Sequence, residues 1–251
     1  IGQYAFANCT GLVNLSIPDS VTMFGNYTFA NCTGIQEFIL PSMLKSIGSY
    51  TFQQCVGITK ITIPKGVAVI GSYAFIGCSC LVDVNIENGV PCLGEFTFFD
   101  CPGIQSISLP ESITFINQNA FNGYVCLSNV NIPDNVTLIG PQSFANCPSI
   151  KTLRMPPSIT KIDVRAFDNC TGLQDIQFSN NITIIEDSAF SRCYALQTVK
   201  LPSKLTYLGS HVFAHCCGLT EVIFNELITA IGSYSFYNCS GLMEIGNLPE
   251  Q

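Results

Sequence analysis

The chain has 251 residues, of which 47% are apolar and only 11% are charged. The apolar residues come in short groups such as Val67–Ile70, whereas a membrane-spanning helix needs about 18 or more in a row, so the composition predicts a buried core rather than a membrane span. The net charge is −7 with ten Lys and Arg residues in total, which argues against the phosphate-binding surface that nucleic acids or anionic lipids require.

A phenylalanine recurs every 23 residues without insertion or deletion. A fixed period of this kind indicates a repeat array in which each unit contacts only its neighbours. We therefore predict one elongated solenoid over residues 1–251, with about eleven 23-residue repeats in place of separate globular domains. Neither end carries the polar sequence typical of a terminal repeat, so we expect a fragment without caps. The phenylalanines are Phe6, Phe29, Phe52, Phe75, Phe98, Phe121, Phe144, Phe167, Phe190, Phe213 and Phe236.

Each repeat opens on a turn that is marked by its Phe. Counted from this Phe, a Cys follows at position +3 in ten of the eleven copies, and Tyr124 takes its place in the other. A spacing of three puts the two side chains on one face of a 3₁₀ turn or a single α turn, directed at the core. A glycine four residues before the Phe, such as Gly48 or Gly71, is expected to supply a positive φ there.

A strand follows the turn. Apolar residues alternate at +9 and +11, as in 104–110, which is typical of a half-buried strand, and a Pro at +12 ends it in seven of the eleven copies. A second apolar pair at +15 and +18, as in 136–139, completes the coil. One coil cannot bury its own apolar face, so coils must stack, with parallel strands about 4.8 Å apart.

The full pattern L-x-x-I-x-I-P-x-x-V-T-x-I-G-x-x-A-F-x-N-C resembles the 23-residue BspA-like (Treponema pallidum-type) class of leucine-rich repeats, over nearly the whole chain. The Asn or Cys that usually follows the strand in leucine-rich repeats is replaced by the Pro turn. The resemblance implies a right-handed coil with a parallel sheet on its concave face and short 3₁₀ or helical turns and loops on the other side. It also implies a role in adhesion or protein recognition.

The chain contains fourteen cysteines. The ten in the repeat position are interpreted as small buried hydrophobes. Parallel inward side chains about 4.8 Å apart are poorly placed for the Cβ separation of about 3.8 Å that a disulfide prefers, so we expect free thiols. The four cysteines outside this position are the better candidates for exposure or oxidation, and their pairing cannot be read from the sequence: Cys80, Cys92, Cys126 and Cys217.

Two clusters have the residue types of a metal site. His211, His215, Cys216 and Cys217 lie within seven residues, but they occupy ordinary repeat positions and Cys216 is expected to point inward, so zinc is not predicted. Acidic residues in adjacent repeats are interpreted as a solvated face rather than a calcium site: Asp163, Glu186 and Asp187. With no nucleophile motif beside either His, we predict neither an enzyme nor a cofactor.

Outward positions of the strands are the predicted binding surface. At +8 five residues are acidic and Lys60 is basic, while at +10 the residues are mostly small and polar. A solenoid sheet often offers an extended surface to a partner, here one with basic or hydrogen-bonding character, although solubility alone explains polar residues equally well. The predicted protein-binding residues are Glu37, Lys60, Asp83, Asn85, Asn129, Asn131, Arg154, Asp175, Gln177, Lys200 and Glu221.

The predicted function is a non-enzymatic protein-binding and adhesion module of a cell-surface or secreted protein. Its partner would be a protein, such as a host or matrix protein, and neither nucleic acid nor direct membrane insertion is expected. The alternative is an intracellular structural or scaffold protein of the cytoplasm or cytoskeleton, in which the solenoid serves as a rigid spacer. The many expected free thiols suit a reducing compartment and favour this alternative.

Overall fold

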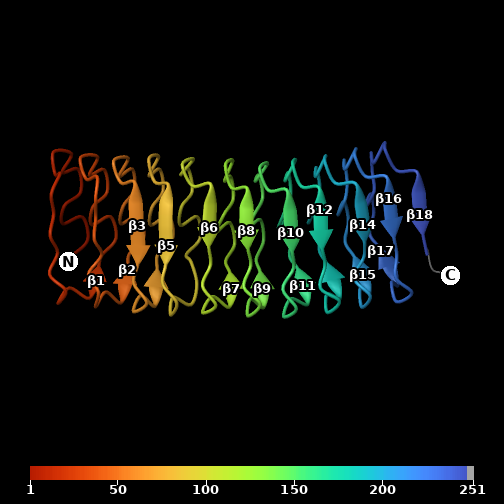
Figure 1. Ribbon diagram of the computed structural model, residues 1–251, viewed down its shortest axis with the longest axis horizontal. Coiled ribbons are helices and arrows are strands. Elements are labelled where there is room, and N and C mark those ends of the chain that lie inside the picture. The colour runs from red at the N-terminus through yellow and green to blue at the C-terminus, as the bar shows by residue number, and fades with distance from the viewer. Residues whose placement is uncertain (248–251) are drawn as a thin grey trace.

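The computed structural model describes residues 1–247 as a solenoid of parallel coils that follow one another from the N-terminus to the C-terminus (Figure 1). The last four residues of the predicted 1–251 unit lie outside the described residues. Every strand pairing joins residues 23 positions apart, for example Lys60 with Asp83 and Ile162 with Ile185. The sequence period is therefore one coil, as the predicted leucine-rich-repeat architecture requires.

The predicted strand after the Phe turn is present from the coil of Phe52 onward, whereas the same segments after Phe6 and Phe29 form no strand beyond a single bridge at Glu37. We call the outward surface of this row of segments the long-strand face. Its strands form three hydrogen-bonded groups, β3-β5-β6-β8, β10-β12 and β14-β16-β18. Their bounds are Lys60–Ile63 (β3), Asp83–Ile86 (β5), Ser106–Ser108 (β6), Asn129–Asn131 (β8), Thr152–Arg154 (β10), Asp175–Gln177 (β12), Thr198–Lys200 (β14), Glu221–Ile223 (β16) and Glu244–Gly246 (β18).

A short strand also ends at the second residue of the apolar pair at +15 and +18 in most repeats, though not in the segment from Val90 to Leu93, and the sequence pattern alone had not indicated it. These two-residue strands make the groups β1-β2-β4 and β7-β9-β11-β13-β15-β17. Figure 1 shows them as a lower row of short arrows. Their bounds are Met23–Phe24 (β1), Ser46–Ile47 (β2), Val69–Ile70 (β4), Phe115–Ile116 (β7), Leu138–Ile139 (β9), Lys161–Ile162 (β11), Ile184–Ile185 (β13), Tyr207–Leu208 (β15) and Ala230–Ile231 (β17).

The turn around the Phe differs in detail from the predicted helical turn. In the coil of Phe29, the amides of Tyr27, Phe29 and Asn31 donate to carbonyls of the next coil, at 3.0, 2.8 and 2.7 Å. Ala30 and Cys32, which alternate with them, close i to i−3 bonds within the coil instead, onto Tyr27 at 3.2 Å and onto Phe29 at 3.1 Å. A 3₁₀ helix needs such bonds at consecutive residues, so the segment is a row of turns joined to its neighbours. We call this surface the turn face.

The glycine prediction was wrong. Positive φ values fall on residues two before and two after the Phe, such as Tyr27 at 56° and Asn31 at 60°, and not on Gly48 or Gly71. A Cβ on Gly71 would lie 2.3 Å from the backbone nitrogen of Ser49 in the preceding coil. Glycine is therefore required by the close approach of successive coils rather than by its backbone freedom.

The core is a set of columns that run along the solenoid. Phe rings of successive coils stack at centroid distances of 4.9 to 5.6 Å, and those from Phe29 to Phe213 are fully buried. No stacked pair joins Phe98 to Phe121 within residues 1–247; there Tyr124 takes the Cys position and packs edge-on against Phe121 at 5.5 Å. The larger Tyr side chain, whose hydroxyl is buried without a partner, interrupts an otherwise regular column.

Nine of the ten cysteines of the column also link two coils; Cys9 makes no such bond among the described residues and, against the prediction, is exposed, while Cys239 is half-buried. The thiol of Cys55 donates to the backbone oxygen of Phe29 at 3.1 Å, and Cys147 donates to Phe121 at the same distance. The position therefore needs a small apolar side chain with a weak donor, which describes cysteine. All fourteen cysteines are free thiols, and Cys80, Cys126 and Cys217 are exposed as expected, whereas Cys92 is half-buried.

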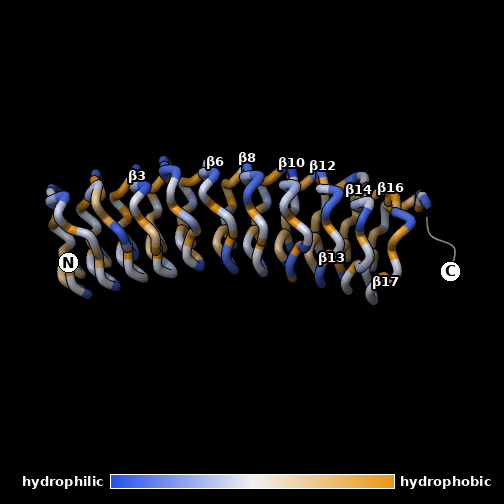
Figure 2. The backbone as a smooth tube through the Cα atoms, turned by 90° about the horizontal axis from the view of Figure 1, so that it is seen from below, coloured by the Kyte–Doolittle hydropathy of each residue, from blue (hydrophilic) through white to orange (hydrophobic). Residues whose placement is uncertain are grey.

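The stack is nearly straight in Figure 1 and only gently bowed in Figure 2. Both sides of a coil are extended segments joined to the next coil at β spacing, so neither side is forced wider, as a row of helices about 10 Å across would require. The long-strand face is consequently shallow, and any recess in it must come from its side chains.

We predict that Phe144→Ala lowers the free energy of unfolding by about 3–5 kcal/mol, because it leaves a cavity between two stacked rings. The matched control is Phe115→Ala, since Phe115 is 36% exposed and lies outside the column; its expected cost is about 1 kcal/mol. Urea unfolding of the three proteins measures both values. Equal losses for the two variants would show that the Phe column is not the main core.

The cysteines give a second prediction, since burial raises the pKa of Cys55 and of Cys147 to about 12. At pH 8 an aromatic disulfide reagent should react quickly with the exposed thiols of Cys9, Cys80, Cys126 and Cys217, and with the eight buried thiols only after unfolding.

The same thiols make stability depend on pH. Buried thiols keep their protons while unfolded ones lose them, so the free energy of unfolding should fall as pH rises above the ordinary thiol pKa of about 8.5. Thiol counting and unfolding curves from pH 8 to pH 10 check both expectations. Rapid native-state reaction of Cys55 or Cys147, or stability that rises with pH, would contradict the buried column.

Candidate functional site

The predicted binding residues lie on the long-strand face because side chains of a strand alternate between core and solvent. Lys60 and Asp83 are exposed neighbours on β3 and β5, and their Nζ and Oδ2 atoms are 2.8 Å apart. Glu37 lies in the preceding coil, where its backbone forms a parallel β-bridge with that of Lys60. The hydrogen bond and charge of Asp83 raise the pKa of Lys60. Acidic and basic side chains therefore alternate across three successive coils.

The remaining predicted residues continue the same two columns toward the C-terminus. Arg154 lies opposite Gln177, and its Nη1 atom reaches Asp134 Oδ1 at 2.8 Å, which raises the pKa of the guanidinium. These side chains are exposed except Glu221, which is half-buried. They share the face without gathering around one recess: Asn129, Asn131, Arg154, Asp175, Gln177, Lys200 and Glu221.

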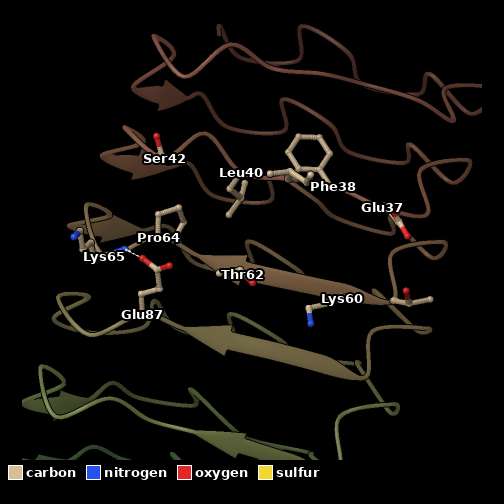
Figure 3. A pocket seen from close by; sticks show the side chains of 11 residues that line it. Glu37, Phe38, Leu40, Ser42, Lys60, Thr62, Pro64, Lys65 and Glu87 are labelled. Atoms are coloured by element: carbon tan, nitrogen blue, oxygen red, sulfur yellow. Dashed lines mark hydrogen bonds between the residues drawn. The ribbon is translucent and has the colours of Figure 1, made fainter.

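The N-terminal half of the face is hollowed. A recess of about 520 Å³ lies over β3 and the segment before it. Charged residues line its two ends, and Phe38 and Leu40 line its middle (Figure 3). At one end stand Glu37 and Lys60. At the other, the Glu87 carboxylate accepts a hydrogen bond from the backbone nitrogen of Lys65 at 2.8 Å.

Two further recesses adjoin the first. One of about 760 Å³ shares Glu37, Ile39 and Leu40 with it, and one of about 500 Å³ shares Lys60 and Thr62 and extends to Asn85. We call the three together the long-strand groove, which spans the face from Asn14 to Ser108. Of the predicted residues, the groove brings together Glu37, Lys60, Asp83 and Asn85.

Ile39 is a functional candidate that the sequence prediction missed. Its side chain is 84% exposed in the column that holds Ser16 and Thr62 in neighbouring coils, and it lines two of the three recesses. A large apolar side chain at the centre of a polar surface is the usual anchor of a protein interface. The available signal was the apolar residue in a mostly polar column, which Ile39 shares with Ile223.

The two candidate metal clusters do not form in the described chain. The Cys216 thiol is buried and donates to the Phe190 oxygen at 3.3 Å, while Cys217 is exposed. Within residues 1–247 no group of three or more His, Cys, Asp or Glu side chains could hold a metal ion.

The acidic side chains of the other cluster already have partners. Lys161 Nζ lies 3.6 Å from Asp163 and 2.9 Å from Glu186, and the Asp187 carboxylate accepts from the Ser210 amide at 2.7 Å. Nor does the described part of the chain contain a helix whose length and apolar character would let it cross a membrane.

Comparisons with known proteins agree with this architecture. The chain is similar to a leucine-rich repeat protein from Bacteroides ovatus, with 27% identity over 98% of this chain and 75% of that one and a TM-score of 0.67. It is similar to a leucine-rich cell surface protein from Faecalibacterium prausnitzii, with 27% identity over 98% and 82% and a TM-score of 0.55.

The leucine-rich repeat protein of Treponema pallidum shares the fold at 23% identity, over 69% of this chain and 82% of that one, with a TM-score of 0.62. No curated protein matches the chain at a significant level. A family model described as a BspA-type leucine-rich repeat region of six copies matches residues 1–128 and again residues 114–243. The chain therefore belongs to the BspA-type leucine-rich repeat family.

Proposed function

We propose that the chain is a non-enzymatic protein-binding module that recognises its partner in the long-strand groove. The exposed Ile39, set between charged side chains in a recess on a rigid sheet, is the observation that carries this proposal. An apolar anchor gives affinity when it is desolvated, and surrounding charges select the partner. The proposed partner segment therefore presents an apolar side chain between charged groups of both signs, complementary to Glu37, Lys60 and Glu87.

We further propose that the module belongs to a cell-surface or secreted adhesion protein. The F. prausnitzii protein, a cell surface protein at 27% identity, supports this location. The second candidate is an intracellular scaffold in which the solenoid is a rigid spacer, and the fourteen free thiols favour it because reducing compartments preserve thiols.

The groove is tested with peptides selected from a displayed random library on the immobilised chain. Ile39→Asp should weaken the selected peptides by about tenfold or more, because a carboxylate replaces the apolar anchor. Val69→Asp is the matched control, since Val69 is 57% exposed on a different face, and it should leave binding unchanged. Surface plasmon resonance measures the dissociation constants. Binders that both variants weaken equally, or that ignore Ile39→Asp, would rule out the groove as the recognition site.

The location is tested with a membrane-impermeant amine-reactive biotin ester on intact cells that produce the protein naturally. Exposed lysines such as Lys45 and Lys204 should be biotinylated without lysis if the protein is on the surface. Labelling that appears only after lysis, despite normal expression, would favour the intracellular scaffold.

A further inference from the structure

A separate, fourth recess lies on the turn face, away from the three recesses of the long-strand groove. It has a volume of about 230 Å³ and spans the coils of Phe167, Phe190 and Phe213. The whole chain contains three arginines and two histidines, and this recess is lined by two of those arginines and both histidines. The residues are Arg165, Arg192, His211 and His215, gathered on a chain whose net charge is −7.

The fold directs these side chains to one place. All four have positive φ, at 54° for Arg165, 61° for Arg192, 58° for His211 and 64° for His215, because they stand two residues before or after the Phe of their coil. The residues two before the Phe and those two after it form two columns along the turn face. Small residues between these columns, such as Ala214, leave the recess open. In the N-terminal coils the column of Arg165 and His211, two residues before the Phe, holds aromatic rings instead. These rings stack at centroid distances of 4.7 to 4.9 Å: Tyr4, Tyr27, Tyr50, Tyr73 and Phe96.

The wall of the recess contains a buried carboxylate. The side chain of Asp168 is only 9% exposed, and its Oδ2 atom accepts a hydrogen bond from Arg192 Nη2 at 2.6 Å. Its Oδ1 atom is buried and has no hydrogen-bond partner among the described residues. Burial raises the pKa of this carboxyl, against the opposing effects of Arg192, Arg165 and Ser191. A buried acceptor left unpaired is destabilising, so a ligand that donates a hydrogen bond to it binds more tightly than one that does not.

The chemistry of the recess specifies two properties of a ligand. Guanidinium groups present only donors and bind oxyanions, often with two parallel hydrogen bonds. The two arginines outnumber the single carboxylate, so the recess carries a net positive charge and favours an anion. The free oxygen of Asp168, in contrast, requires a hydrogen-bond donor on the same ligand.

We propose that this recess is a binding site for a small oxyanion that also carries a hydrogen-bond donor. Hydrogen phosphate has both groups on one atom, and an acidic sugar has a carboxylate beside hydroxyl groups. Sulfate has the charge and the shape of phosphate but no proton at neutral pH, so it leaves Asp168 unpaired. The site would give the protein a small-molecule specificity separate from the long-strand groove.

Isothermal titration calorimetry of the full chain at pH 7 and constant ionic strength tests the proposal with sodium phosphate, sodium glucuronate, sodium sulfate and glucose. Phosphate or glucuronate should bind at one site, sulfate about tenfold more weakly, and glucose not detectably. Phosphate binding identifies an inorganic or ester phosphate as the ligand, and glucuronate binding alone identifies an acidic sugar. Failure of both to bind, or sulfate binding as tightly as phosphate, would overturn the proposal.

Variants locate the site. Arg165→Ala should weaken the bound anion by about tenfold or more, since its guanidinium is exposed and forms none of the ion pairs of the described fold. The matched control is Arg154→Ala, which removes the one arginine outside the recess and should leave the affinity for the anion unchanged. Asp168→Asn keeps the shape but supplies a donor, so it should bring sulfate up to the affinity of phosphate. An equal effect of the two arginine variants would place binding elsewhere.

Discussion

The structure depends on one constraint, which is that each coil must bond to an identical neighbour at the spacing of a β-sheet. On the turn face the amide of Phe29 donates to the backbone oxygen of Thr51 in the next coil, and the thiol of Cys55 in that coil donates back to the backbone oxygen of Phe29. Every such bond joins equivalent or nearly equivalent positions of successive repeats. A side chain that fits one coil therefore fits all of them, which explains why the Phe and Cys columns hardly vary.

The same constraint leaves the outward positions free to vary, and the two candidate sites use this freedom differently. In the long-strand groove an exposed Ile39 replaces a small polar residue, and charged neighbours surround it. In the turn-face recess Arg165 and His211 replace the tyrosines of earlier coils, while Arg192 and His215 replace an asparagine that several other coils hold two residues after the Phe. Asp168 stands where the preceding coil has Ala145. The regular columns hold the scaffold rigid, so single substitutions suffice to give each stretch of the surface its own chemistry.

Much of the fold could be predicted from the sequence, because stacking repeats the same signal in every coil. The spacing of Phe52 and Cys55 predicted the buried columns, and the alternation after them predicted the long strands. The pattern could not show that Tyr27 and Asn31 adopt positive φ in place of glycine, since this follows from hydrogen bonds to the next coil. Nor could it show the burial of Asp168 or the prominence of Ile39, which depend on side chains of neighbouring coils rather than on their own repeat.

Residue-resolved amide hydrogen exchange tests the coil-to-coil bonding most directly. The amides of Phe144 and Phe167 donate to Ala166 and Ala189 of the following coils, both at 2.8 Å. They should exchange orders of magnitude more slowly than the exposed turn amides of Asp134 and Asn135, because opening them requires coils to separate. Exchange of the Phe144 and Phe167 amides at the rate of these turn amides would contradict a solenoid held together by bonds between its coils.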